Sequence, residues 1–233
     1  MSVSVLITSE FVPSAMVENE WMSGLPKLRR AELARWPDHR ARRRSLLGSR
    51  LLAEGLVRLG FRSDGLSSLR YFPKARPTLD LPVDFSLSHC EGRIVCALST
   101  SGRVGIDVEG IGNLKAGDFQ LYLSAAERAW AGSSARRFYS VWTRKEAVAK
   151  AAGSDGLRDV GRVDTSMAEH CAALAGRLWH TPSVPVGRAH IAHLALENEP
   201  CELTVRFISS RELEHEALLT KRVSGVNSLR AVL

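Results

Sequence analysis

Apolar and polar residues alternate in several short stretches of the chain. This pattern predicts β-strands, because successive side chains on a strand point to opposite faces. The predicted strands span residues 2–8, 83–88, 93–99, 103–109, 188–196 and 201–208. The pairs Glu91-Gly92 and Ser101-Gly102 provide turns between the middle strands, and these turns predict a meander.

Residues 26–59 are dominated by helix formers, but Pro37 divides them because proline cannot occupy the interior of a regular helix. One helix is predicted to end at this break and a second to begin near Asp38. Leucines recur along the second helix at helical spacing, which indicates that one face lies in a core. These leucines are Leu46, Leu47, Leu51, Leu52 and Leu56.

Ser124 and Glu127 form the sequence of a capping box, in which the serine accepts from the first helical turn and the glutamate reaches back. This pair predicts a helix over residues 125–131. Further helices are predicted over residues 135–152 and 210–219. Strands and helices are thus mixed along the chain, which favours an α/β (α+β) fold in two halves that meet near residues 100–110.

Composition adds charge to this picture. The chain has 233 residues, 45% of them hydrophobic, which is enough for a substantial core. Its formal net charge of +7 predicts an anionic partner, such as a phosphorylated cofactor, a nucleic acid or an acidic protein. The four cysteines match no zinc spacing and no disulfide framework. No secretory signal or membrane-spanning stretch is recognisable, so we expect a cytoplasmic protein.

The strand sequence VGIDVE at residues 104–109 holds the first candidate site. If its valines and isoleucine face the core, Asp107 and Glu109 share the opposite face. Two neighbouring carboxylates repel each other unless a cation lies between them, and oxygen ligands suit magnesium. Taken alone, a strand with a polar outer face remains the simpler interpretation.

The helix sequence FYSVWTRKEAVAKA at residues 138–151 holds the second candidate. Trp142, Glu146 and Lys150 fall in one row, each four residues apart, along the border of an apolar stripe. The glutamate and lysine could therefore be partly desolvated and still reach a cleft. Taken alone, an ordinary surface ion pair is the simpler interpretation, and it would contribute only a few tenths of a kcal/mol.

Two weaker signals suggest phosphate binding. The half-buried strand FSLSHC at residues 85–90 ends in Ser88 and His89, which could contact a phosphate or simply form a turn. Arginine offers a fork geometry that suits phosphate, although an arginine run can also be a solvated helix face. The arginines concerned are Arg29, Arg30, Arg35, Arg40, Arg42, Arg43, Arg44 and Arg50, with Arg76 apart from them.

In this order, the sequences FSLSHC, VGIDVE and FYSVWTRKEAVAKAAG resemble the Sfp-type 4′-phosphopantetheinyl transferases. The upstream Arg44-Ser45-Leu-Leu-Gly48 is similar to the family's arginine-hydroxyl-LLG helix, and the resemblance covers roughly residues 40–157. It implies two similar α/β halves in a pseudo-twofold arrangement, each a small sheet packed against a long helix. On this basis we expect an N-terminal half over residues 1–105 and a C-terminal half over residues 106–233, with coenzyme A in the cleft between them.

The resemblance also implies an activity, the magnesium-dependent transfer of 4′-phosphopantetheine from coenzyme A to a serine of an acyl or peptidyl carrier protein. Magnesium, or manganese, would be held by Asp107, Glu109 and Glu146. Glu146, or a water it holds, would take the serine proton, and Lys150 would neutralise the leaving adenosine 3′,5′-bisphosphate. The residues expected to contact coenzyme A are Arg44, Ser45, Arg76, Ser88, His89, Lys145 and Lys150.

The resemblance further implies a monomer that meets an acidic carrier protein. From the residues themselves we expect neither a membrane nor a nucleic-acid partner. Two departures from the family are visible: Ala75-Arg76-Pro77 replaces the usual Gly-Lys-Pro, and the segment Gly153–Leu157 carries one extra residue. The alternative is a non-catalytic relic that binds coenzyme A or a carrier protein, although the retained acidic residues and Lys150 argue against it. A nucleic-acid binder is suggested by charge alone, and no recognisable motif supports it.

Overall fold

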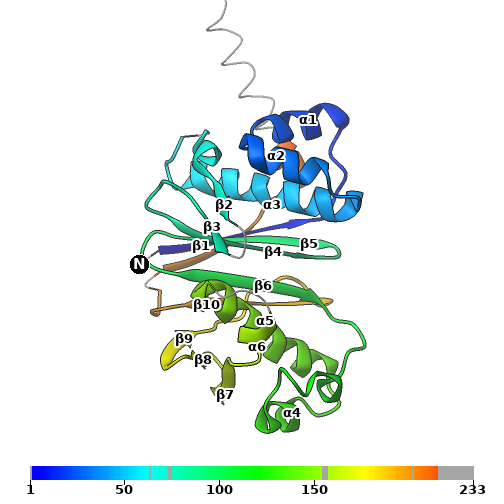
Figure 1. Ribbon diagram of the computed structural model, residues 1–233, viewed down its shortest axis with the longest axis vertical. Coiled ribbons are helices and arrows are strands. Elements are labelled where there is room, and N and C mark those ends of the chain that lie inside the picture. The colour runs from blue at the N-terminus through cyan, green and yellow to red at the C-terminus, as the bar shows by residue number, and fades with distance from the viewer. Residues whose placement is uncertain (1, 63, 73–74, 154–156, 201, 215–233) are drawn as a thin grey trace, which may run out of the picture.

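The computed structural model describes residues 2–62, 64–72, 75–153, 157–200 and 202–214. Within them, two sheets are stacked on each other and helices cover the outer faces, as Figure 1 shows. The mixed α/β class predicted from the sequence is confirmed. Residues 210–214 are helical, and the rest of the helix predicted at 210–219 lies outside the described residues, as do residues 154–156.

The first sheet combines strands from both ends of the chain. In spatial order its strands are β11 (Glu202–Phe207), β1 (Ser2–Ser9), β5 (Arg93–Ser99) and β4 (Asp84–Cys90). β1 pairs parallel with β11 and antiparallel with β5, which in turn pairs antiparallel with β4. The predicted turn between β4 and β5 is confirmed, and Gly92 adopts a φ of 79°, which favours glycine.

The second sheet begins with the strand that carries the candidate carboxylates. In spatial order its strands are β6 (Val104–Gly110), β10 (His190–Leu196), β9 (Arg177–His180), β8 (Cys171–Leu174) and β7 (Asp164–Ala168). The predicted meander is therefore wrong at β6, which pairs with β10 instead of β5. Apolar side chains of β6 face the inner surface of the first sheet, so this strand stacks on that sheet and does not extend it.

The helices on the first sheet are α1 (Ala15–Ser23), α2 (Lys27–Ala34) and α3 (His39–Arg58). The predicted break is confirmed, since Asp38 caps α3 and accepts hydrogen bonds from the amides of Arg40 and Ala41 at 2.8 and 3.1 Å. The predicted apolar face of α3 is confirmed as well, because its leucines at 46, 47, 51, 52 and 56 are buried. The sequence reading did not predict α1.

The helices of the second half are α4 (Ala125–Ala131), α5 (Ala135–Ala152) and α6 (Leu157–Val160). The capping box of Ser124 and Glu127 is confirmed at α4. The end of α5 at Gly153 is also confirmed, and this residue adopts a left-handed φ of 78°. The remaining elements are the hairpin of β2 (Arg70–Phe72) and β3 (Ala75–Thr78) and the 3-10 helices η1 (Gly65–Ser68) and η2 (Ala116–Phe119).

An apolar core between the sheets holds the two halves together. The first sheet contributes Val5 and Val95 among others, and the second contributes Ile106 and Leu194 among others. Each sheet carries one long helix on its outer face, α3 on the first and α5 on the second. The pseudo-twofold relation and the division at residues 105 and 106 stay predictions, and β11 joins the sheet of the N-terminal half.

Among the described residues, no helix is both long and apolar enough to cross a bilayer. Cys90, Cys96 and Cys171 are free thiols, in agreement with the sequence reading, and Cys201 lies outside the described residues.

The imidazole of His193 on β10 makes stability depend on pH. It is 6% exposed, and its Nδ1 lies 2.7 Å from the hydroxyl of Thr143 on α5. Burial, followed by the charge of Arg144, lowers the pKa of His193 to about 3, whereas an unfolded histidine titrates near 6.5. As the pH falls below 6.5, the unfolded chain therefore binds a proton that the folded chain does not bind.

We expect the free energy of unfolding to fall by about 1.4 kcal/mol per pH unit from this group between pH 6.5 and 3. Denaturant titrations of the wild type and of His193→Asn at several pH values measure the effect. The free energy of unfolding should depend less steeply on pH in the variant, by the contribution of one proton. His39→Asn is the control, because His39 is exposed at the start of α3. Equal slopes in the wild type and His193→Asn would contradict this assignment.

Candidate functional site

A cavity of about 640 Å³ opens where β4, β6, α3 and α5 meet the β2–β3 hairpin. All the predicted site residues line it except Arg44 and Lys145. The lining residues are Arg29, Trp36, Ser45, Gly48, Tyr71, Ala75, Arg76, Pro77, Phe85, Ser86, Leu87, Ser88, His89, Asp107, Glu109, Glu146 and Lys150. Residues far apart in the sequence are thus gathered at one site.

Side chains of β4 set the position of β6. Three alternate residues of β4 each accept a hydrogen bond from a backbone amide of β6: Asp84 from Val104 at 2.7 Å, Ser86 from Ile106 at 3.1 Å and Ser88 from Val108 at 3.4 Å. These bonds tie the edges of the two sheets together. They fix the register that places the hydroxyl of Ser88 beside the carboxylate of Asp107.

Asp107 is the centre of the acidic end of the cavity and is only 3% exposed. Its Oδ1 accepts hydrogen bonds from the hydroxyl of Ser88 at 2.8 Å and from the ammonium of Lys150 at 2.6 Å. Its Oδ2 is buried and has no hydrogen-bond partner in the described part of the chain. A buried carboxylate oxygen without a partner is costly, so this atom is a candidate ligand for a cation.

Burial and the charge of Asp107 also affect the pKa values of the two neighbouring carboxylates. Burial, and next the charge of Asp107, raises the pKa of Glu109 to about 7. Burial and Asp107 also raise the pKa of Glu146 above its ordinary value. Lys150 partly compensates both groups. The negative charge gathered here exceeds what this one ammonium neutralises, so a further cation would be stabilised.

The three carboxylates fit a hard divalent cation by their chemistry, since they offer only oxygen donors and Asp107 has a spare one. Among the described residues, no three acidic, histidine or cysteine side chains already converge on one point as a ligand set. Asp107, Glu109 and Glu146 are the residues that could hold such an ion.

The cavity is also lined by basic and aromatic side chains, which we call its basic end. Arg29 is buried there, and its Nη2 donates to the hydroxyl of Ser45 at 2.5 Å. The guanidinium carbon lies 4.3 Å from the ring centre of Tyr71 and 5.5 Å from that of Trp36. Stacking on aromatic rings holds the guanidinium in place, and such a group can receive an anion.

His89 lines the cavity at the end of β4. Burial lowers its pKa, and the positive charges of Arg44 and Lys150 lower it further. In either protonation state the imidazole has a ring N–H that can donate a hydrogen bond to an anion. Arg44 does not line the cavity but lies near His89, 3.8 Å from the carboxylate of Glu10.

The structure does not bring Lys145 to this cavity. The ammonium of Lys145 is 1% exposed, lies 3.0 Å from the carboxylate of Glu127 and donates to the carbonyl of Val163. Burial lowers its pKa, and Glu127 offsets part of this effect. The expectation that Lys145 touches phosphate is corrected, because adjacent positions on a helix point about 100° apart and only Glu146 faces the carboxylate cluster.

The sequence reading did not single out Arg29, Trp36 or Tyr71 as lining residues. Arg29 belongs to the arginine run and Trp36 precedes the helix break, but neither position marks its side chain as facing a cavity. Tyr71 lies on a strand of three residues, which is too short to show a periodic pattern.

Comparisons with known proteins agree with the resemblance seen in the motifs. The family model described as the 4′-phosphopantetheinyl transferase superfamily matches residues 103–204. A curated relative, the 4′-phosphopantetheinyl transferase gsp of Aneurinibacillus migulanus, is 28% identical over 142 residues. This match spans 59% of the chain and 60% of the relative. The family resemblance drawn from the sequence is confirmed.

Proposed function

We propose, on the premise that residues 103–204 belong to the 4′-phosphopantetheinyl transferase superfamily, that this chain modifies carrier proteins. It transfers the 4′-phosphopantetheine moiety of coenzyme A to a serine of an apo acyl or peptidyl carrier protein. The products are the holo carrier protein and adenosine 3′,5′-bisphosphate. The observation that carries this proposal is a single cavity that is lined both by a carboxylate cluster and by Arg29, Ser45 and His89.

The acidic end would hold magnesium through Asp107, Glu109 and Glu146. A divalent ion bound there supplies charge neutralisation for the pyrophosphate of coenzyme A. The unpaired Oδ2 of Asp107 and the raised pKa values of Glu109 and Glu146 support this assignment. Manganese has similar ligand preferences and would be an alternative ion.

In the transfer, the serine hydroxyl of the carrier forms a bond to the phosphorus next to pantetheine, and the bond from that phosphorus to the bridging oxygen breaks. Glu146, or a water that it holds, takes the proton of the hydroxyl. The ammonium of Lys150, held 2.6 Å from Asp107, neutralises the leaving phosphate. Positioning and charge neutralisation supply most of the rate enhancement in such reactions.

The basic end would receive the nucleotide part of coenzyme A. Arg29, Ser45 and His89 line this end, and Arg44 lies beside His89. We assign the 3′-phosphate to this group. Ser88 and Lys150 lie beside Asp107, with the ammonium 3.0 Å from the hydroxyl, and would contact the pyrophosphate of coenzyme A. The predicted contact between Arg76 and coenzyme A is not part of this proposal, because both Nη atoms of Arg76 donate to oxygens of the protein itself.

The release of nucleotide tests the proposal. We expect coenzyme A to be converted to adenosine 3′,5′-bisphosphate only when an apo carrier protein is present, as measured by chromatography. A carrier whose acceptor serine is replaced by alanine should give no product. Nucleotide release that does not depend on that serine would contradict the assigned reaction and would indicate a hydrolase.

His89→Ala is expected to weaken coenzyme A binding about 10-fold, because a hydrogen bond to a charged group contributes roughly 1.5–3 kcal/mol. Binding of dephospho-coenzyme A, which lacks the 3′-phosphate, should hardly change. Calorimetric titration of both ligands measures the difference. His190→Ala is the matched control, since His190 bonds to the carbonyl of Glu91 outside the cavity. Equal losses for both ligands would contradict a 3′-phosphate site at His89.

A further inference from the structure

The guanidinium of Arg76 on β3 points into the protein and not into the cavity that its side chain lines. Its Nη1 donates to the carbonyls of Lys150 and Ala151, both at 3.0 Å. Its Nη2 donates to Asp84 at 3.0 Å, to the carbonyl of Phe85 at 2.6 Å and to the carbonyl of Val104 at 2.9 Å. The four N–H groups on these two nitrogens are therefore fully used by protein oxygens and are not free to bind a phosphate.

The acceptors of Arg76 come from separate elements that meet at this point. Phe85 and Asp84 lie on β4 of the first sheet, and Val104 lies on β6 of the second. Lys150 and Ala151 lie in the last turn of α5, where carbonyls lack the usual partner four residues later, although that of Lys150 also accepts from the capping amide of Gly153. A cation at the carboxyl end of a helix is also favoured by the helix dipole. Arg76 thus fastens α5 to both sheets.

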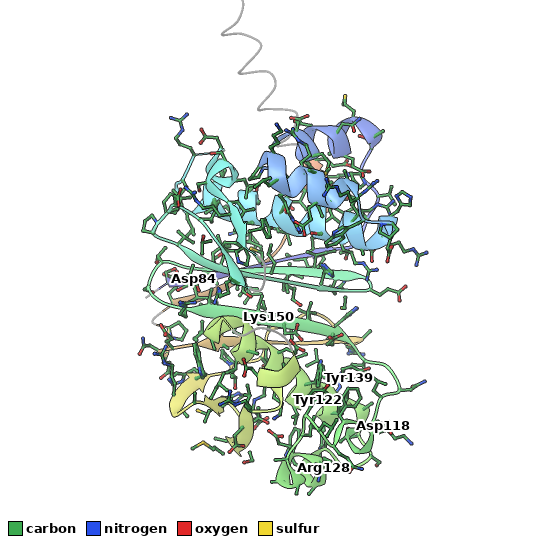
Figure 2. All side chains as sticks on the ribbon, viewed as in Figure 1. Asp84, Asp118, Tyr122, Arg128, Tyr139 and Lys150 are labelled. Atoms are coloured by element: carbon green, nitrogen blue, oxygen red, sulfur yellow. The ribbon has the colours of Figure 1, made fainter. Side chains whose placement is uncertain are left out.

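Asp84 completes this junction. Its Oδ2 accepts from both Arg76 and the amide of Val104, so one carboxylate joins β3, β4 and β6. The side chain of Arg76 is 12% exposed, which limits screening of the ion pair. Burial lowers the pKa of Arg76, and Asp84 offsets part of that effect. Figure 2 labels Asp84 near the boundary of the two sheets and Lys150 on α5 below it.

We propose that Arg76, together with Asp84, is a positioning residue that fixes the carboxyl-terminal turn of α5 against β4 and β6. One of the backbone carbonyls that Arg76 binds belongs to Lys150, whose ammonium contacts Asp107 and Ser88. The pair therefore sets the position of Lys150 relative to the carboxylate cluster. Its effect on activity rests on the proposed transfer reaction.

Lysine cannot take over this role. One ammonium has three donors on a flexible stem, whereas Arg76 presents a planar fork to acceptors on opposite sides. Arg76→Lys should therefore resemble Arg76→Met, although it retains the charge. A residue that contacts the phosphates of coenzyme A would behave differently, because a lysine there would keep most of the attraction.

Steady-state kinetics of the full chain test the proposal. For Arg76→Lys and Arg76→Met we expect kcat to fall about 10- to 100-fold, since small misplacements of catalytic groups cost this much. KM for coenzyme A should stay within about 3-fold of the wild-type value. Asp84→Asn is a milder variant, and its effect should be less than additive with that of Arg76→Met. The matched controls are Arg70→Met and Asp80→Asn, an exposed ion pair of the same hairpin, and they should change nothing.

A raised KM with unchanged kcat, or full activity in Arg76→Lys, would overturn the proposal in favour of a ligand contact. A lowered Tm with normal kcat and KM would also overturn it, because the contacts would then only stabilise the fold. Hydrogen exchange at the amide of Gly153, which bonds to the carbonyl of Lys150, gives a readout independent of activity. It should be faster in Arg76→Met than in Arg70→Met. If the wild type transfers nothing, the proposed function fails, and this exchange rate alone decides the role of Arg76.

Discussion

Replacing Gly105 by alanine is expected to lower the free energy of unfolding by about 4 kcal/mol or more, which is exceptional for a single added methyl group. A Cβ at this position of β6 would lie 2.0 Å from the carbonyl oxygen of Ala147 and 2.7 Å from the amide nitrogen of Ala151. Both atoms belong to the backbone of α5, so no side-chain rotation can relieve the contact. Denaturant unfolding followed by circular dichroism measures the loss.

The close approach at Gly105 also positions the site. It presses β6 against α5 and so brings Asp107 and Glu109 to the helix that carries Glu146 and Lys150. Any Gly105→Ala protein that still folds should therefore lose transfer activity. Gly117→Ala is the control, because a Cβ at Gly117 meets nothing within 4 Å. A Gly105→Ala variant as stable as Gly117→Ala would contradict the packing described for these two elements.

Replacing Asp107 by asparagine is expected to reduce transfer at least about 100- to 1000-fold, the size typical for loss of one preorganised electrostatic group. The amide removes the negative charge and the spare oxygen that could hold a cation. It can still accept from Ser88, and it removes a charge that raises the pKa of Glu109 and Glu146. We therefore expect the free energy of unfolding to change by less than about 1 kcal/mol.

Transfer rates and thermal unfolding of the Asp107→Asn protein measure these two effects separately. Asp118→Asn is a suitable control, because Asp118 lies far from Lys150 in Figure 2 and is exposed. A variant that retains its rate would remove Asp107 from the catalytic machinery. A variant that loses its fold would leave the rate unexplained, and in that case Glu109→Gln would decide the role of the cluster.

Local patterns revealed much of the fold because they act within one element. The leucine spacing of α3, the cap at Asp38 and the capping box at α4 depend on neighbours a few residues away, and each is confirmed. The pairing partner of β6 could not be predicted from such a local pattern. Pairing with β5 and pairing with β10 would both leave Val104, Ile106 and Val108 on one face of the strand, so its sequence pattern is the same in either case.

The same distinction between local patterns and distant contacts applies to the residues of the candidate site. Spacing on one strand and one helix made Asp107, Glu146 and Lys150 candidates, and the family resemblance assigned them to one site. The structure gathers them in one cavity. The buried pairing of Lys145 with Glu127 joins two helices, and no local pattern indicates it. The same is true of Arg76, whose five acceptors lie 8 to 75 residues away in the sequence.

The mass of a carrier protein after incubation tests the proposed function most directly. An apo acyl or peptidyl carrier protein is mixed with the chain, coenzyme A and magnesium, and the intact carrier is then weighed by mass spectrometry. We expect a gain equal to one phosphopantetheine, which is absent after chelation of the metal and in Asp107→Asn. No gain on fatty-acid, polyketide or peptide carriers, despite measurable binding of coenzyme A, would contradict the transfer reaction and would identify the chain as a non-catalytic binder.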